Sequence, residues 1–593
     1  MERLLRHISS VTYRNIGVLV AALCLSAIML PTVMPVETGW SDAEIVLCRI
    51  IPFIAAAGCV SIYISKRLPR FSAVDFIAMA WAAYSLCRCW LDSSYPAAGY
   101  AMRMLMMSVL YLSLRLFSSR IRQVGYIFSC LILLFSLLEA GEGILQVISG
   151  TSRHHLYPAT GSFLNPGPYS AYLTLGLVIA LSISRIRHDD IIVPISGRHA
   201  IRMKTENMAM AAASLLLAMI ILTMSRAAFV ASSICCIIIF KDTMWKWRWW
   251  VAAVAIPVAT ALYFMKSGSA DGRWVINRIG ALCISDNPLF GGGIGSFFYL
   301  FSEKTAEVTL SGVAIDIVKV DVISYSFNDL LRVGVEQGLV GLFIVVGLII
   351  MVMFRLLHSS RPLFLSMLSL LIISLFSYPF ELLPFQIIAT VAAAYAGSVH
   401  EIPSCGTRPV KNFTLNFITI LCVSLIISTA VCKVADIVGI RKKAQEEYSL
   451  IAYNPHPAFT DDYYSLLPFL DDNKRFLFDF ARLLAAQSRY NDSNEMLKRG
   501  TFVSNDPMFH VLTGNNYLNM GEYDAAEREY LVAWRMMPNR IYPLYRLMKL
   551  HQTVGDTARM VDYAGKVVEF RTKVSSPATT DMKREARLII SEM

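Results

Sequence analysis

An arginine lies almost directly between two long apolar segments of the chain. Ser225-Arg226 separates these segments with almost no loop. An arginine in such a place is costly unless it reaches water, a lipid headgroup or an anion. Two interpretations therefore stay open. Arg226 is either an interfacial residue that extends to headgroups, or it binds an anion through the bidentate geometry of its guanidinium.

A second polar segment runs from Arg273 to Gly341 and is the largest polar interruption in the hydrophobic part of the chain. It contains Asn328, Arg332 and Glu336, which are spaced four apart. On a helix these three side chains form one polar stripe. Arg332 and Glu336 can pair with each other, which is the simplest interpretation. A polar stripe that enters a membrane still marks a cavity more often than a lipid-facing surface.

Several further features of the polar segments have two interpretations each. The glycines of the turn at 288–293 either let backbone N–H groups approach a phosphate or form an ordinary turn. Glu142 and Glu381 are further candidates, after Glu336, for a base that accepts a proton from a hydroxyl. Residues 307–323 are β-prone and partly alternating, which predicts a small hairpin.

The composition indicates what kind of protein carries these residues. Of its 593 residues, 55% are hydrophobic and 16% are charged, whereas a soluble protein has about 25% charged residues. Apolar runs long enough to cross a bilayer recur along the chain. We predict an all-α, polytopic membrane protein with about thirteen transmembrane helices. The predicted spans cover roughly residues 15–35, 44–65, 72–91, 100–118, 124–148, 167–186, 207–225, 226–241, 249–265, 328–354, 362–379, 383–398 and 413–434.

Loop charges predict the orientation of these spans. The net charge of +11 is a topology signal in a membrane protein and does not indicate nucleic acid as a partner. Every second loop is basic, which places the N-terminus in the cytoplasm. An odd number of spans then places the C-terminal region in the periplasm. The polar loops, including a large one at about 266–327, fall on the same periplasmic side.

The composition changes after about residue 436, where charged residues become common and long apolar runs stop. We predict a membrane domain over 1–436 and a soluble helical domain over 437–593. Gly521 and Gly555 are 34 residues apart, which is the period of a tetratricopeptide repeat. Such repeats form a concave surface, so we expect this domain to bind an acceptor or a protein partner. An unrelated helical hairpin is the alternative.

The second half of the polar segment carries a recognisable motif. Asn328 is followed at the expected distance by Gly338 and Gly341, and Ser225-Arg226 is continued by two alanines. With Arg273 and the glycine turn after it, these features resemble the bacterial O-antigen ligase and polymerase superfamily, which includes protein O-oligosaccharyltransferases. The resemblance covers roughly residues 130–400. Phe327 is the departure, because the family usually has His at that place.

The resemblance implies glycosyl transfer. A glycan would leave its polyprenyl diphosphate carrier and join an acceptor hydroxyl, on lipid A core or on a protein, at the periplasmic face of the bacterial inner membrane. By the same resemblance, Arg226 and Arg273 bind the diphosphate. Glu336, Asn328 and Arg332 are the catalytic candidates, because these polar residues are retained beside the departure at Phe327. We expect no metal and no cofactor in this reaction. The expected partners are the lipid-linked donor, the acceptor and membrane lipids.

Two other functions compete with ligation. The superfamily also contains polymerases that join polysaccharide repeat units, and its motifs barely separate the two activities. A non-enzymatic transporter or a repeat-bearing scaffold is the third hypothesis. The missing His and the C-terminal repeats favour a scaffold, whereas the lack of an obvious internal duplication speaks against a transporter.

Overall fold

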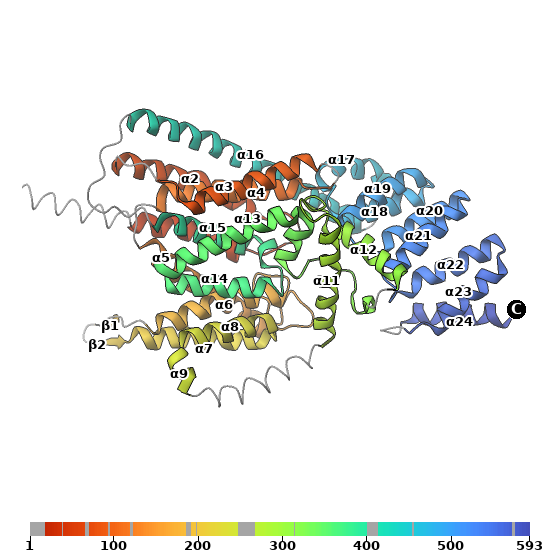
Figure 1. Cartoon of the computed structure of the whole chain (residues 1–593), viewed down its shortest axis with the longest axis horizontal. Helices are drawn as coiled ribbons and strands as arrows, with labels where there is room; N and C mark the ends of the chain where they lie inside the picture. Colours follow the sequence, from red (N-terminus) through yellow and green to blue (C-terminus); the bar gives the residue numbers. More distant parts are fainter. Residues whose placement is uncertain are drawn as a thin grey trace, which may run out of the picture.

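The structure is a computed structural model that describes residues 18–37, 39–65, 70–92, 95–118, 123–185, 191–196, 199–246, 267–312, 315–399, 413–453, 456–571 and 576–592. The long apolar runs fold as helices, because a helix satisfies its backbone hydrogen bonds within itself. Figure 1 shows these helices side by side along the long axis of the molecule, with α11 lying across one end of them and the C-terminal helices beyond it.

The helices of the apolar region are η1 (Leu30–Val33), α2 (Asp42–Ser65), α3 (Ala73–Leu91), α4 (Ala98–Ser118), α5 (Val124–Ser149), α6 (Pro166–Ile183), α7 (Thr205–Thr223), α8 (Arg226–Ile239), α9 (Lys241–Lys246), α13 (Asp329–Ser359), α14 (Arg361–Ser374), η3 (Pro379–Glu381), α15 (Leu383–Ser398) and α16 (Phe413–Tyr453). A short antiparallel hairpin, β1 (Ile191–Ser196) and β2 (His199–Met203), joins α6 to α7.

The helical membrane fold is confirmed. Among the described residues, seven helices are long and apolar enough to cross a membrane, and four shorter apolar helices accompany them. Helix α6 is the most enclosed of the seven, with 89% of its residues buried. The predicted span at 72–91 is a helix but belongs to neither group. The predicted span at 249–265 lies outside the described residues.

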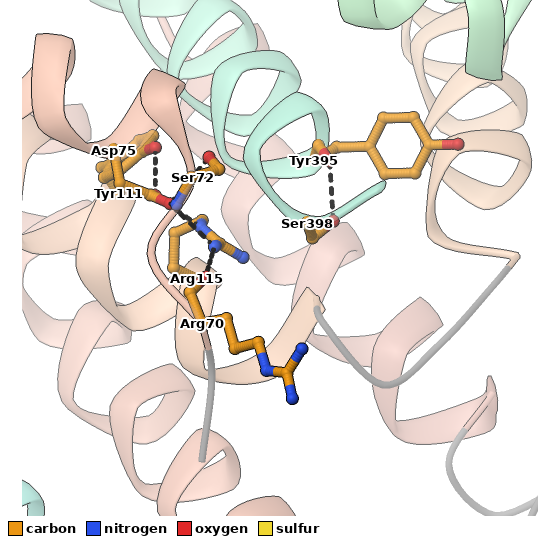
Figure 2. Close-up of polar contacts among 7 residues, drawn as sticks. All are labelled: Arg70, Ser72, Asp75, Tyr111, Arg115, Tyr395 and Ser398. Carbon is orange, nitrogen blue, oxygen red and sulfur yellow. Dashed lines mark hydrogen bonds and ion pairs between the residues drawn. The ribbon is translucent and has the colours of Figure 1, made fainter. Parts of the chain in front are cut away.

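A buried ion pair joins α3 and α4, and α15 passes close to it (Figure 2). Arg115 Nε lies 2.6 Å from Asp75 Oδ1, and the Tyr111 hydroxyl donates to the same oxygen at 2.6 Å. Gly397 of α15 faces this pair so closely that a Cβ would lie 2.9 Å from Arg115 Nε. A buried charge is costly unless it is paired and hydrogen-bonded. The cluster fixes how these three helices pack.

The polar segment before α13 is helical as well. It contains α11 (Ser267–Asp286), α12 (Phe297–Ser311) and η2 (Ile317–Lys319). The predicted hairpin at 307–323 is therefore wrong over its first part. Phe297, Phe301 and Val308 are all buried on one face of α12, and this helical spacing outweighs the short alternation that follows it.

The C-terminal region forms helices that pack in successive neighbouring pairs. They are η5 (Pro457–Phe459), α17 (Thr460–Leu470), α18 (Lys474–Ala486), α19 (Tyr490–Val503), α20 (Met508–Met520), α21 (Tyr523–Met536), α22 (Ile541–Val554), α23 (Thr557–Glu569) and α24 (Pro577–Ser591). Helix α16 continues without interruption through residue 436, and its Tyr448 is buried in the core of the C-terminal helices. The tetratricopeptide assignment and the division at 436 remain predictions.

The C-terminal helices pack against the segment that contains α12 and η2. Thr309 Oγ1 donates to the Arg535 carbonyl at 2.8 Å, and Asn539 Nδ2 donates to the carbonyls of Val318 at 3.1 Å and Val320 at 3.0 Å. Arg540 pairs with an aspartate of the same segment. These contacts hold the C-terminal helices at the end of the bundle where the candidate site residues lie.

Candidate functional site

A cavity of about 1240 Å³ lies between the membrane helices and the C-terminal helices. Its lining changes along α13, from Arg332 and Glu336 in the first turns to Leu348 and Val352 farther on. Asn473, the N-cap of α18 in the C-terminal helices, also lines it. The cavity therefore has a polar part near the C-terminal helices and an apolar part among the membrane helices, as an amphipathic ligand requires.

Arg332 is the centre of the polar part. Its Nε lies 3.0 Å from Glu336 Oε1, which is the pairing expected from their spacing, and its Nη1 lies 2.8 Å from Glu381 Oε2. Glu381 comes from η3, which lies far away in the sequence. The Glu336 side chain is only 2% exposed, whereas those of Glu381 and Arg332 are 15% and 25% exposed. Of the two carboxylates that pair with Arg332, the one on Glu381 is therefore more accessible to a ligand.

The backbone of Glu336 is held by the glycine turn, because its carbonyl accepts from Gly293 N at 3.0 Å. Its carboxylate pairs with Arg332. Its geometry suits holding Arg332 in place.

The glycine turn at 288–293 packs into a break in α13. Gly338 has φ 67° and ψ −167°, which interrupts the helical ladder, and essentially only glycine adopts this conformation. Leu339 N and Val340 N then donate to the carbonyls of Pro288 and Leu289 at 2.7 and 3.1 Å. Because Gly291, Gly292 and Gly293 use their N–H groups on backbone carbonyls, the ordinary-turn interpretation holds, and these N–H groups do not form a phosphate cradle.

Asn328 is placed differently from the expected polar stripe. It is the N-cap of α13, and its Oδ1 accepts from Leu331 N at 3.1 Å. Its Nδ2 approaches Asn277 Oδ1 at 3.4 Å. A cap of this kind satisfies a backbone donor that the helix itself leaves open. Asn328 does not line the cavity, so its observed contacts support the start of α13, while Arg332 and Glu336 face the cavity.

Arg226 and Arg273 form a second group of polar residues. Arg226 is the first residue of α8, after Met224 and Ser225 have ended α7 and begun the new helix. Arg273 lies on α11. Burial and then the neighbouring positive charge of Arg226 lower the pKa of Arg273. In the part of the chain that the structure describes, no carboxylate pairs with Arg273. Two guanidinium groups whose charges act on each other can bind an anion together.

Aromatic residues connect the two groups. Arg273 Cζ lies over the Phe327 ring, 5.4 Å from its centre, and Phe327 packs edge-on against Tyr378 at 5.6 Å. Tyr378 stacks on Tyr325 at 3.6 Å and receives a hydrogen bond from Asn165 Nδ2 at 3.1 Å. Asn165 and Tyr325 line the cavity. The aromatic residues therefore lie between the arginines and the cavity.

The polar loops that the sequence placed on one side do meet in space. Asn165 lies just before α6, Arg273 lies in the segment before α13, and Tyr378 lies between α14 and α15; the contacts above join all three. Sequence analysis missed Tyr378, although the proline and glutamate beside it mark a short polar turn between two apolar helices. It also missed Asp329, whose Oδ2 accepts from Phe380 N at 3.2 Å. Glu142 is exposed and does not line the cavity.

Fold and site together define a helical membrane protein with a cationic group beside a large amphipathic cavity. Residues 211–346 match the family model described as O-antigen ligase. The resemblance inferred from the sequence is confirmed over this segment, which contains Arg226, Arg273, Asn328, Arg332 and Glu336. The match supports glycosyl transfer of the ligase or polymerase kind, with lipid-linked glycan donors and acceptors in general. A search among curated proteins found no match.

Proposed function

We propose that this protein moves a glycan from a polyprenyl diphosphate carrier to an acceptor hydroxyl at the periplasmic face of the inner membrane. The observation that carries this proposal is the pair Arg226 and Arg273, two arginines whose charges act on each other. Arg273 has no carboxylate partner among the described residues. Each guanidinium offers several N–H donors in one plane, which matches a diphosphate. The two charges stabilise the diphosphate as it leaves the sugar.

In this reaction the acceptor oxygen forms a bond to the anomeric carbon. The bond from that carbon to the diphosphate breaks, and its electron pair leaves with the diphosphate. The hydroxyl proton passes to a carboxylate. We assign this proton to Glu381, because its side chain is the more exposed of the two carboxylates that share Arg332. Glu336 was the first candidate for this base from the sequence, and we assign it instead the role of holding Arg332.

The cavity suits the acceptor. Its polar part contains Glu381 and residues of the C-terminal helices, which supports a role for those helices in binding the acceptor. Its apolar part fits the lipid portion of a membrane-anchored molecule. A lipid A core and a protein remain the two acceptor classes. The reaction uses no metal and no cofactor in this proposal.

The arginines provide the first test. Arg226→Ala and Arg273→Ala are expected to lower transfer by about 10²–10³-fold each, the usual effect of removing one group that stabilises developing charge. Arg226→Lys should restore little, since a lysine lacks the planar fork. Transfer is measured with purified full-length protein and a lipid-linked glycan. Full transfer by both alanine variants would refute the diphosphate site.

The two carboxylates are separated in the same assay. Glu381→Gln should lower turnover by about 10²–10⁴-fold, the range for loss of a general base, without weakening donor binding. Glu336→Gln should instead weaken the ion pair that holds Arg332, and it should lower both the turnover and the unfolding temperature of the protein. Normal turnover in both variants would mean that neither of the two carboxylates that pair with Arg332 accepts the proton.

Ligation is favoured over polymerisation because the polar part of the cavity is shared with the C-terminal helices. Surface glycans of a deletion strain distinguish the two. Loss of attachment with intact lipid-linked polymer indicates a ligase, whereas short unpolymerised glycan indicates a polymerase. Normal glycan in both forms would contradict any enzymatic role and favour a scaffold.

The proposal also fixes the orientation of the chain, with the N-terminus in the cytoplasm and the C-terminal helices in the periplasm. It is motivated by the alternation of basic and non-basic loops. A reporter fused after residue 593 should be active only in the periplasm. A cytoplasmic signal from this fusion would contradict the proposed side of the reaction.

A further inference from the structure

Phe327 occupies an unusual backbone conformation. Its φ is +54°, in the left-handed region, and only two other non-glycine residues of the described chain have positive φ. This region is unfavourable for a bulky residue and is populated mainly by glycine and asparagine-like residues. The residue directly precedes Asn328, the N-cap of α13. Such a conformation persists only when surrounding contacts maintain it.

The aromatic contacts that maintain the backbone conformation of Phe327 also involve Arg273. The ring of Phe327 is half-buried, packs edge-on against Tyr378 at 5.6 Å, and has Arg273 Cζ over it at 5.4 Å from the ring centre. Tyr378 is itself held by its stack on Tyr325. The ring of Phe327 is therefore fixed on one side, and the guanidinium rests on it at the distance of a cation–π contact.

The chemistry of a phenyl ring suits this contact. A carboxylate beside Arg273 would neutralise the charge that the diphosphate needs. An imidazole would add a titratable group next to the positive charges of Arg273 and Arg226. A phenyl ring attracts the guanidinium through the quadrupole of the ring. Because the ring is not a strong hydrogen-bond acceptor and carries no charge, the N–H donors and the positive charge of Arg273 stay available. The ring can orient Arg273 without competing with an anion.

We propose that Phe327 is a positioning residue for Arg273, which it holds ready to bind the diphosphate of the donor in the function proposed above. Phe327 then takes no part in proton transfer. Its role at this place in the sequence is to orient a cation, and its effect on the reaction is exerted through donor binding.

A double-mutant cycle tests this role. Full-length protein in detergent is titrated with farnesyl diphosphate, and farnesol serves as the control for binding of the chain alone. Phe327→Leu is expected to weaken binding of the diphosphate by about tenfold, the effect of losing a partly desolvated cation–π contact, and Phe327→Tyr should retain most of the affinity. In the Arg273→Gln background, Phe327→Leu should have no further effect, because the partner is already lost.

A matched control removes a similar contact elsewhere. Arg489 lies over Tyr464 at the same 5.4 Å in the C-terminal helices, so Tyr464→Leu should leave farnesyl diphosphate binding unchanged. Phe327→Met is the second variant, to be used if Phe327→Leu does not fold as judged by thermal unfolding. In transfer assays Phe327→Leu should mainly raise the donor KM, whereas Arg273→Gln should also lower kcat, because Arg273 stabilises the leaving diphosphate.

The outcomes separate the two proposals. If Arg273→Gln weakens binding and Phe327→Leu does not, or if Phe327→Leu weakens it equally with and without Arg273, the positioning role is refuted and the diphosphate site stands. If Arg273→Gln and Arg226→Gln both bind farnesyl diphosphate like the unmodified protein, the proposed function itself fails. Equal weakening by Phe327→Leu and Tyr464→Leu would also refute a specific role for Phe327.

Discussion

Replacing Gly338 by alanine should disrupt the packing of the glycine turn against α13. Gly338 has a backbone conformation that costs other residues about 1–3 kcal/mol. An added Cβ would also lie 2.4 Å from the Leu289 carbonyl oxygen, so the turn must move. That movement weakens the two hydrogen bonds from residues 339 and 340 to the turn, each worth about 0.5–1.5 kcal/mol. Together these effects predict about 2–6 kcal/mol of destabilisation.

Gly347 is the matched control, because it lies in the same helix and a Cβ there would meet nothing within 4 Å. Gly347→Ala should be neutral or stabilising by up to about 1 kcal/mol, the difference in helix propensity. The assay is thermal unfolding of the detergent-solubilised full-length protein, followed by glycan transfer. Glycan transfer should fall by more than the loss of folded protein explains, since Gly293 of this turn donates a hydrogen bond to the Glu336 carbonyl. Equal unfolding temperatures for the two variants would refute this account of the break.

Three further predictions concern the rest of the molecule. Asp75→Asn removes the buried carboxylate that faces Arg115 and should destabilise the protein by about 3–5 kcal/mol, and a thermal unfolding curve unchanged from the unmodified protein would contradict this. Asn539→Ala loses two hydrogen bonds of 3.0 and 3.1 Å, so limited proteolysis should cut the segment after α12 faster; an unchanged cleavage rate would oppose that inference. A hydrogen bond from Lys549 lowers the pKa of Glu585, so its stabilisation of α24 is present at neutral pH and is lost as the pH falls below the usual glutamate range. Hydrogen exchange in α24 should therefore lose less protection on acidification in Glu585→Gln than in the unmodified protein, and identical losses would contradict the prediction.

Local sequence was sufficient for features that depend on neighbouring residues. Helices followed from the length of apolar runs, and Arg332 with Glu336 followed from their spacing of four. The same approach failed at 307–323, where a short alternation was interpreted as a hairpin. The residues that decide the helix, such as Phe297 and Phe301, lie earlier in the chain. A window that began at 307 contained too little of the helical period.

The glycine turn is a motif that the sequence reveals but whose structural role it does not. The positions of Gly291 and Gly338 were recognised from the sequence, but their relation was not. A Cβ on Gly291 would lie 2.6 Å from Gln337 N, and one on Gly338 would lie 2.6 Å from Gly291 N. Each glycine is needed because the other backbone passes close to it. Such an approach joins segments nearly fifty residues apart, and no local pattern encodes it.

The sequence by itself determined the helical membrane class, the resemblance to O-antigen ligases and the identity of Arg226, Arg273, Arg332 and Glu336 as candidates. The membrane class depends on composition and hydrophobic length, and the pairing of Arg332 with Glu336 depends on a short spacing within one segment. The roles of Arg226 and Arg273 follow from the resemblance. Only the tertiary structure brought Glu381 to Arg332 and assigned Asn328 to a helix cap. Ion pairs and aromatic contacts form between side chains that the folded backbone brings together. Sequence order does not fix those distances, because they are set by the packing of whole helices against one another.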